Sequence, residues 1–152
     1  MLSLAAVYYS GKESGGTTIP ADRNLLDIVA TFNLSDALSF VLNYDKGEQD
    51  KVGGATAKWD GLAGYANLKL SDTWRTSLRM ESFKDKNCYR TGCAFTSQTL
   101  KEVTLTLAHM PSKHVELRAE IRKDKSNQLV FREGGSTKKS QNSLGLEAIY
   151  KF

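Results

Sequence analysis

The residues of this chain best suited to catalysis are two histidines, His109 and His114, which lie on either side of a turn at Pro111. A histidine base must reach its nucleophile directly, and no serine within a strand stands two residues from either histidine. The carboxylates Glu116 and Glu120 are separated by an arginine, which indicates ion-pair partners rather than an acid and a base of different pKa. We therefore expect no catalytic residue and a protein that is not an enzyme.

Cofactor chemistry is not indicated either. The cysteines and histidines have no spacing typical of zinc ligands, and no glycine-rich phosphate loop is present. Cys88 and Cys93 lie together in the segment NCYRTGC, and this short spacing predicts a disulfide, which export through an oxidising compartment permits. The alternative is a reactive or metal-binding dithiol. We expect neither a metal nor a cofactor.

Composition leaves the membrane question open. The chain has 152 residues and a formal net charge of +4, with basic residues spread along it among nearly as many acidic ones, so nucleic-acid binding is not expected. The mean hydropathy is −0.40 and no run of about 18 apolar residues occurs, which excludes a spanning helix. A membrane barrel remains compatible, because its strands alternate between apolar and polar side chains. Residues 1–152 are expected to form a single domain.

Segments of about ten residues with a period of two recur along the whole chain. They predict an all-β protein. Together with the connections and the aromatic residues described below, they predict an eight-stranded antiparallel up-and-down transmembrane β-barrel. The expected strands cover residues 2–10, 24–34, 37–45, 56–70, 74–84, 99–110, 114–124 and 140–152. In the last long connection, Leu129, Val130 and Phe131 further predict a hairpin that turns at Gly134 and Gly135.

The connections alternate in length. Short ones (35–36, 71–73 and 111–113) separate long ones (11–23, 46–55, 85–98 and 125–139). Outer-membrane barrels have short periplasmic turns and long extracellular loops, and an even number of strands returns both termini to the periplasmic side. A soluble lipocalin-like ligand-binding barrel, which does not require long loops at one end only, is the alternative.

Each strand has one apolar and one polar face. In the second, Leu26 and Ile28 share one face, while Asp27 and Thr31 lie on the other. If the apolar face meets lipid, the inward charges balance and should pair across a narrow lumen as a plug, with a network of Arg79, Arg118, Glu120 and Glu147 at mid-height. The other inward charges are Asp27, Lys69, Arg75, Glu81, Glu102, Glu116, Arg122 and Lys151. The alternative is a passive channel for small solutes or ions lined by these charges.

Aromatic residues on the apolar faces gather near the two ends of the strands. Phe32, Phe40, Trp74, Tyr150 and Phe152 lie near the short turns, while Tyr8 and Tyr44 lie near the long loops. Aromatic rings favour the headgroup zone, so this placement predicts two girdles.

The last strand, SLGLEAIYKF, ends with Tyr150 and Phe152 on its apolar face. It resembles the final strand of bacterial outer-membrane barrels, whose terminal aromatic residues the insertion machinery reads. With NLLDIVATFNLSDALSFVLNYD, the chain from about Asn24 also resembles the C-terminal part of OmpL-like β-barrel porins. This resemblance implies a Gram-negative outer membrane and, as partners, outer-membrane lipid, lipopolysaccharide and the insertion machinery.

Porins of that family are normally longer and have more strands. The sequence therefore leaves open whether the chain is a small natural member or a truncated or engineered form of a larger porin. We expect a monomeric barrel whose lumen its own side chains fill.

Overall fold

The computed structural model describes residues 1–14, 20–50 and 55–152, and it is all-β, as predicted. The long strands are β1 (Leu2–Glu13), β2 (Ala21–Asn33), β3 (Leu38–Asp50), β4 (Thr56–Lys69), β5 (Trp74–Asp85), β6 (Gln98–Ser112), β7 (Val115–Ser126) and β10 (Ser140–Tyr150). Two short strands, β8 (Phe131–Glu133) and β9 (Ser136–Lys138), form a separate hairpin. Among the described residues, no helix is long and apolar enough to cross a membrane.

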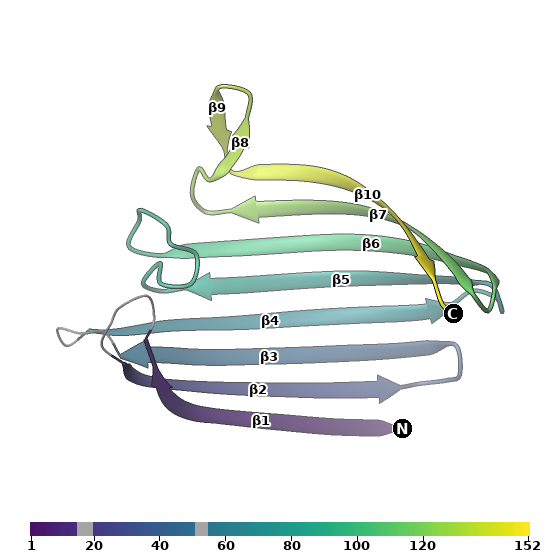
Figure 1. Ribbon diagram of the computed structural model, residues 1–152, viewed down its shortest axis with the longest axis horizontal. Coiled ribbons are helices and arrows are strands. Elements are labelled where there is room, and N and C mark those ends of the chain that lie inside the picture. The colour runs from purple at the N-terminus through teal and green to yellow at the C-terminus, as the bar shows by residue number, and fades with distance from the viewer. Residues whose placement is uncertain (15–19, 51–54) are drawn as a thin grey trace.

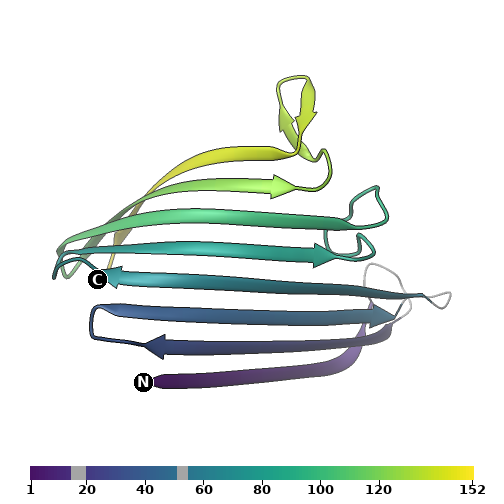
Figure 2. The ribbon, with the colours of Figure 1, turned by 180° about the vertical axis from the view of Figure 1, so that it is seen from behind.

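The eight long strands form one antiparallel sheet in the order β1-β2-β3-β4-β5-β6-β7-β10. Neighbours in this order follow each other along the chain, with only the β8–β9 hairpin inserted before β10 (Figure 1). The short connections and both ends of the chain lie at one end of the strands, and the long connections lie at the other end (Figure 2).

The strands extend further toward the long connections than predicted, because β1 ends at Glu13, β2 begins at Ala21 and β3 ends at Asp50. The predicted connections 11–23 and 46–55 are therefore shorter, 14–20 and 51–55, and the alternation in length is weaker than predicted. The predicted hairpin around Gly134 and Gly135 is present, as a separate two-stranded sheet.

Two of the short turns share the sequence Leu-Ser-Asp and the same local hydrogen bonds. The Ser35 hydroxyl accepts hydrogen bonds from the backbone N–H groups of Ala37 and Leu38 (3.2 and 3.1 Å). The Ser71 hydroxyl does the same for the N–H groups two and three residues further on. A serine hydroxyl that accepts hydrogen bonds from the N–H groups of a turn stabilises a tight reversal of the chain, which explains why these two connections are short.

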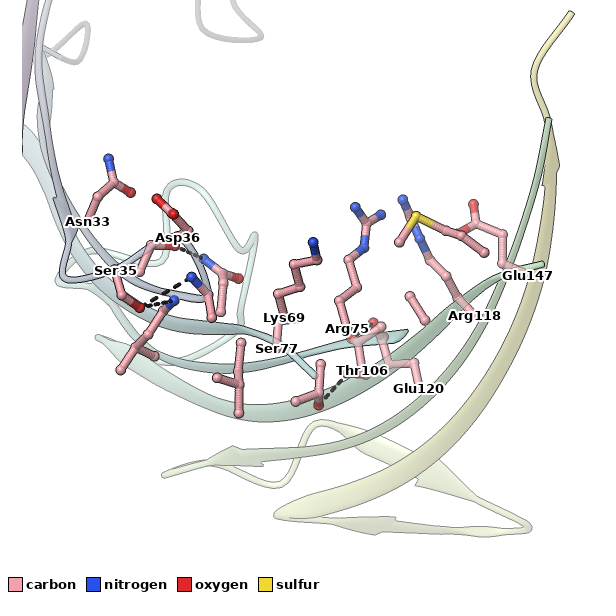
Figure 3. Close-up of a pocket in the computed structure, with 18 of the residues that line it drawn as sticks. Asn33, Ser35, Asp36, Lys69, Arg75, Ser77, Thr106, Arg118, Glu120 and Glu147 are labelled. Carbon is pink, nitrogen blue, oxygen red and sulfur yellow. Dashed lines mark hydrogen bonds and ion pairs between the residues drawn. The ribbon is translucent and has the colours of Figure 1, made fainter. Parts of the chain in front are cut away.

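The sheet is curved, and its two faces differ in chemistry. Figure 3 shows Lys69, Arg75, Arg118 and Glu147 rising from the inside of the curve. The pairing register puts these residues on the concave face and their sequence neighbours on the convex face. Most exposed large hydrophobic residues of the strands belong to the convex set, among them Leu4, Leu42, Leu62, Met80, Leu105, Ile121 and Leu146.

The strands are also staggered. A row of paired residues that starts at Leu2 in β1 passes through Phe32 and Phe40 and reaches Leu144 in β10. Leu144 lies six residues before Tyr150, the last residue of that strand. Such a stagger is the shear that tilted barrel strands require.

The predicted closure of eight strands into a barrel is not observed. In the described part of the chain, no ladder joins β1 to β10, so the sheet has two free edges. Alternation along a strand predicts its faces, whereas closure depends on how two edges far apart in sequence match. These edges differ: β10 turns Glu147 and Lys151 to the concave side, where β1 has Ala5 and Val7.

Close packing of Trp59 over Gly47 gives a testable consequence. A Cβ at Gly47 would lie 2.2 Å from Trp59 Cε2, and the indole is buried. We expect Gly47→Ala to lower the free energy of unfolding by about 1–3 kcal/mol, measured by urea titration in detergent. Gly64→Ala is the control, because its Cβ would meet Leu42 at an ordinary 3.5 Å. Equal stability of the two variants would contradict this packing.

Candidate functional site

The concave face near the short turns is organised around the carboxylate of Glu116, whose side chain is only 1% exposed. Arg118 Nε lies 2.7 Å from Glu116 Oε1, Lys151 Nζ lies 3.1 Å from Oε2, and Arg75 also pairs with this carboxylate. Arg118 continues to Glu147, at 3.0 Å. This Glu116 cluster joins β5, β7 and the C-terminal end of the chain, and three cations surround its one buried carboxylate.

A second group, the Glu102 cluster, lies further along the same strands toward the long loops. Glu102 pairs with Arg79 (3.2 Å) and with Arg122 (2.9 Å), and its side chain is 8% exposed. Arg79 also pairs with Glu81, and Arg122 pairs with Asp124 at 2.8 Å. The cluster links β5, β6 and β7 by bridging carboxylates, an arrangement that leaves no buried charge of this group without a partner.

The four residues predicted as one mid-height network belong to separate arrangements in the structure. Arg118 and Glu147 pair within the Glu116 cluster, and Arg79 belongs to the Glu102 cluster. Glu120 accepts a hydrogen bond from Thr106 Oγ1 (3.0 Å) and makes no ion pair within the described residues. The registers explain the division, because Arg79 is level with Arg122, whereas Arg118 is level with Arg75, four residues earlier.

Sequence reasoning missed an acidic pair on the concave face. Asp27 and Asp45 lie directly opposite each other in the β2–β3 ladder. Asn43 donates a hydrogen bond from Nδ2 to Asp27 Oδ1 (2.6 Å), and no ion pair involves either aspartate in the described part of the chain. The alternation of β3 is the signal that places Asp45 on this face.

A hollow of about 850 Å³ lies over the short-turn half of the concave face, with lining side chains from β2 to β10 (Figure 3). The lining combines apolar residues, such as Leu38 and Met110, with polar and charged ones, namely Asn33, Asp36, Lys69, Arg75, Arg118 and Glu147. The concave side is therefore not filled by its own side chains in this structure.

The β5–β6 connection is built around Asp85, whose side chain is fully buried. Its carboxylate accepts hydrogen bonds from the backbone N–H groups of Tyr89 (3.0 Å), Arg90 (2.7 Å) and Thr91 (2.9 Å). The predicted disulfide between Cys88 and Cys93 is present and spans the same turn. Two constraints therefore shape this loop, one electrostatic and one covalent.

The same loop packs onto the concave side of the sheet. Tyr89 stacks on Trp59 of β4 with ring centroids 5.8 Å apart, and the Arg90 guanidinium lies 5.4 Å from the centroid of the same indole. Arg23 of β2 donates a hydrogen bond to the Tyr89 hydroxyl (3.3 Å) and another to Gln49 Oε1 (2.7 Å). The loop is thus held over the long-loop end of the concave face.

The predicted girdle residues are all exposed: Tyr8, Phe32, Phe40, Tyr44, Trp74, Tyr150 and Phe152. The predicted position of Tyr8 and Tyr44 near the long loops is wrong, because β1 and β3 continue to Glu13 and Asp50 and both tyrosines lie midway along these strands. Both histidines lie near the short turns. His109 stacks on Trp74 with centroids 4.2 Å apart, and His114 Nδ1 lies 2.9 Å from the carbonyl oxygen of Lys151. No group of three or more metal-ligating side chains occurs within the ranges that the structure describes.

Removing the charge of Glu116 tests the first cluster. We expect Glu116→Gln to destabilise the protein by about 3–5 kcal/mol, because three cations would lose their buried counter-charge. The matched control is Glu147→Gln, which removes one partner of Arg118 at a carboxylate that is 56% exposed, and should cost at most about 1 kcal/mol. Urea unfolding in detergent measures both, and equal losses would contradict the special role of Glu116.

Substitution of Asp85 tests the loop. Asp85→Asn removes the charge and one acceptor oxygen, which should weaken the folded loop by about 1.5–3 kcal/mol. Trypsin should then cleave after Arg90 at least about tenfold faster, since cleavage follows the population of the open loop. Asp22→Asn, at an exposed convex-side position, is the control. An unchanged cleavage rate in Asp85→Asn would exclude the carboxylate as the anchor.

Comparison with known protein families gives one match. The sequence model of the family Putative beta-barrel porin-2, OmpL-like, matches residues 1–152. No curated protein and no solved structure matches the chain. The match covers the whole chain and agrees with its antiparallel sheet. The chain therefore belongs to the OmpL-like family of β-barrel porins.

Proposed function

We propose that this chain forms the wall of a passive pore in a bacterial outer membrane and passes small hydrophilic solutes or ions along its concave face. The observation that carries the proposal is a hollow of about 850 Å³ lined by the charged side chains of Lys69, Arg75, Arg118 and Glu147, on a sheet whose opposite, convex face is apolar. Water-filled barrels have this distribution, with polar side chains inside and an apolar band outside. The function needs no reacting group, so we infer that the protein is not an enzyme.

The convex face supports placement in a membrane. Exposed apolar residues there occur on all eight strands of the large sheet, far more than the scattered apolar residues of a soluble surface. Exposed aromatic residues lie near the short-turn ends of the strands, as Trp74 and Phe40 illustrate. A soluble ligand-binding barrel would bury this face, so this alternative is disfavoured.

The free edges of β1 and β10 bear on the membrane-embedded form. In lipid, every backbone N–H and C=O must be hydrogen-bonded within the protein, so open sheet edges are not tolerated. We propose that both edges are paired there and that the sheet is part of a closed barrel. The stagger between Leu2 and Leu144 supports this, since closure requires it.

A barrel plugged by its own charges is the second candidate function. The Glu116 and Glu102 clusters favour it, because paired charges that bridge strands are what a plug would use. The unfilled hollow beside these clusters favours the pore. We propose that the C-terminal Tyr150 and Phe152 are a signal for the insertion machinery, a role that is the same for an open pore and for a plugged barrel.

Single-channel recording separates the two candidates. We expect the full chain, purified in detergent and added to planar bilayers, to produce discrete conductance steps, and their absence would overturn the pore.

Two lysines on opposite faces of β4 give a matched test of whether ions pass along the concave face. Lys69→Glu, in the hollow, should shift the reversal potential in a salt gradient toward cation selectivity, whereas Lys58→Glu, on the convex face, should not.

A further inference from the structure

Four lysines gather on the convex face where β5, β6 and β7 approach the long loops: Lys84, Lys101, Lys123 and Lys125. All four are exposed. Lys101 stands directly opposite Lys125 in the β6–β7 ladder, and Lys123 is opposite Val103 two positions away. Lys84 lies two residues from Ser82, the partner of Lys101 in the β5–β6 ladder. These residues are called the lysine patch below.

The lysine patch contains no counter-charge of its own. Within the described residues, no ion pair involves any of its four ammonium groups. Like charges directly opposite each other on neighbouring strands are destabilising, and their Cβ atoms stand only about 5 Å apart. The arrangement of Lys101 and Lys125 therefore costs stability unless an anion compensates for it.

On the neighbouring strands β3 and β4, the lysines at the same height on the convex face stand opposite carboxylates. On the convex faces of β3 and β4, Lys46 is opposite Asp60 and Lys58 is opposite Glu48. Lys86, just after β5, pairs with Asp60 at 2.7 Å. Lysines and carboxylates alternate there, so the unbalanced positive charge is confined to the convex face from β5 to β7.

The position of the lysine patch identifies the kind of anion. Directly toward the short turns, the same convex face is apolar and exposed, with Leu78, Met80, Val103, Leu105 and Ile121. The patch thus stands at the border between an apolar band and the polar loops, where membrane headgroups lie. Free phosphate would make no use of the apolar strip beneath it.

We propose that the lysine patch and the apolar strip below it bind a phosphorylated membrane lipid of the leaflet on the long-loop side, of the lipopolysaccharide type. The phosphate groups lie against the four ammonium groups, and the acyl chains lie along Leu78, Leu105 and Ile121. Ser82 and Asn142, each paired with a lysine of the patch, supply hydrogen-bonding groups for the headgroup. This inference rests on the membrane placement in the proposed function.

The test uses the full chain in neutral detergent and fluorescently labelled lipopolysaccharide, with binding followed by anisotropy. The variant Lys84→Gln/Lys101→Gln/Lys123→Gln/Lys125→Gln should bind at least about tenfold more weakly, and binding by the unmodified chain should weaken with salt. Dephosphorylated lipopolysaccharide should bind the unmodified chain as weakly as the variant binds the intact lipid. Equal affinity of the variant and the unmodified chain, or of the intact and dephosphorylated lipid, would overturn the proposal.

Matched variants control for total charge and folding. Lys46→Gln/Lys58→Gln removes two convex-face lysines that face carboxylates, and its affinity should stay within about twofold of the unmodified chain. Lys101→Arg/Lys125→Arg keeps the charge and should keep the binding. A loss as large in Lys46→Gln/Lys58→Gln as in Lys101→Gln/Lys125→Gln would reduce the effect to net charge and overturn the patch. Competition by inorganic phosphate at the same concentration as the lipid would exclude a lipid as the ligand.

The outcome is separable from that of the pore. Lipid binding that depends on the lysine patch, found in a protein that shows no conductance steps, would support the lipid site and reject the pore. Conductance steps in a protein that binds phosphorylated and dephosphorylated lipid equally well would support the pore and reject the lipid site.

Discussion

Seven antiparallel ladders join the eight long strands, and the register that they fix determines where every side chain of the sheet lies. A shift of one residue in any ladder would exchange the two faces of a strand. Glu116 would then leave Arg75 of β5 and Glu102 would leave its arginine partners on the neighbouring strands, while Leu117 and Val103 would move to the concave side. Backbone pairing and charge pairing thus favour the same register, which makes that register strongly specified.

The two charged clusters differ in what they contribute. In the Glu102 cluster two arginines alternate with three carboxylates across three strands, so Glu102 is shared by both arginines and the group carries one net negative charge. The Glu116 cluster places one buried carboxylate among three cations and ties the C-terminal Lys151 to the short-turn end of β7. It leaves positive charge beside the hollow, whereas Asp27 and Asp45 leave negative charge on the opposite part of the concave face.

Much of the fold follows from local patterns in the sequence. Period-two alternation predicts the strands and their faces, the short gaps between the alternating segments predict the short connections, and the spacing of Cys88 and Cys93 predicts their disulfide. Features that join distant segments do not follow. The stacking of Tyr89 on Trp59 and the separation of the charges into two clusters depend on relative strand register. Closure is of the same kind, because it depends on the match between the β1 and β10 edges.

The β5–β6 loop, held by Asp85, the Cys88–Cys93 bond and the indole of Trp59, has few conformations available to it. A segment that is already ordered loses little conformational entropy when another molecule passes beside it. The shape of the β5–β6 loop therefore stays constant, and in the proposed pore it would select solutes by size at this end of the concave face. A longer loop without these restraints would give an opening of fluctuating width, and its selection of solutes by size would become weaker as temperature rises.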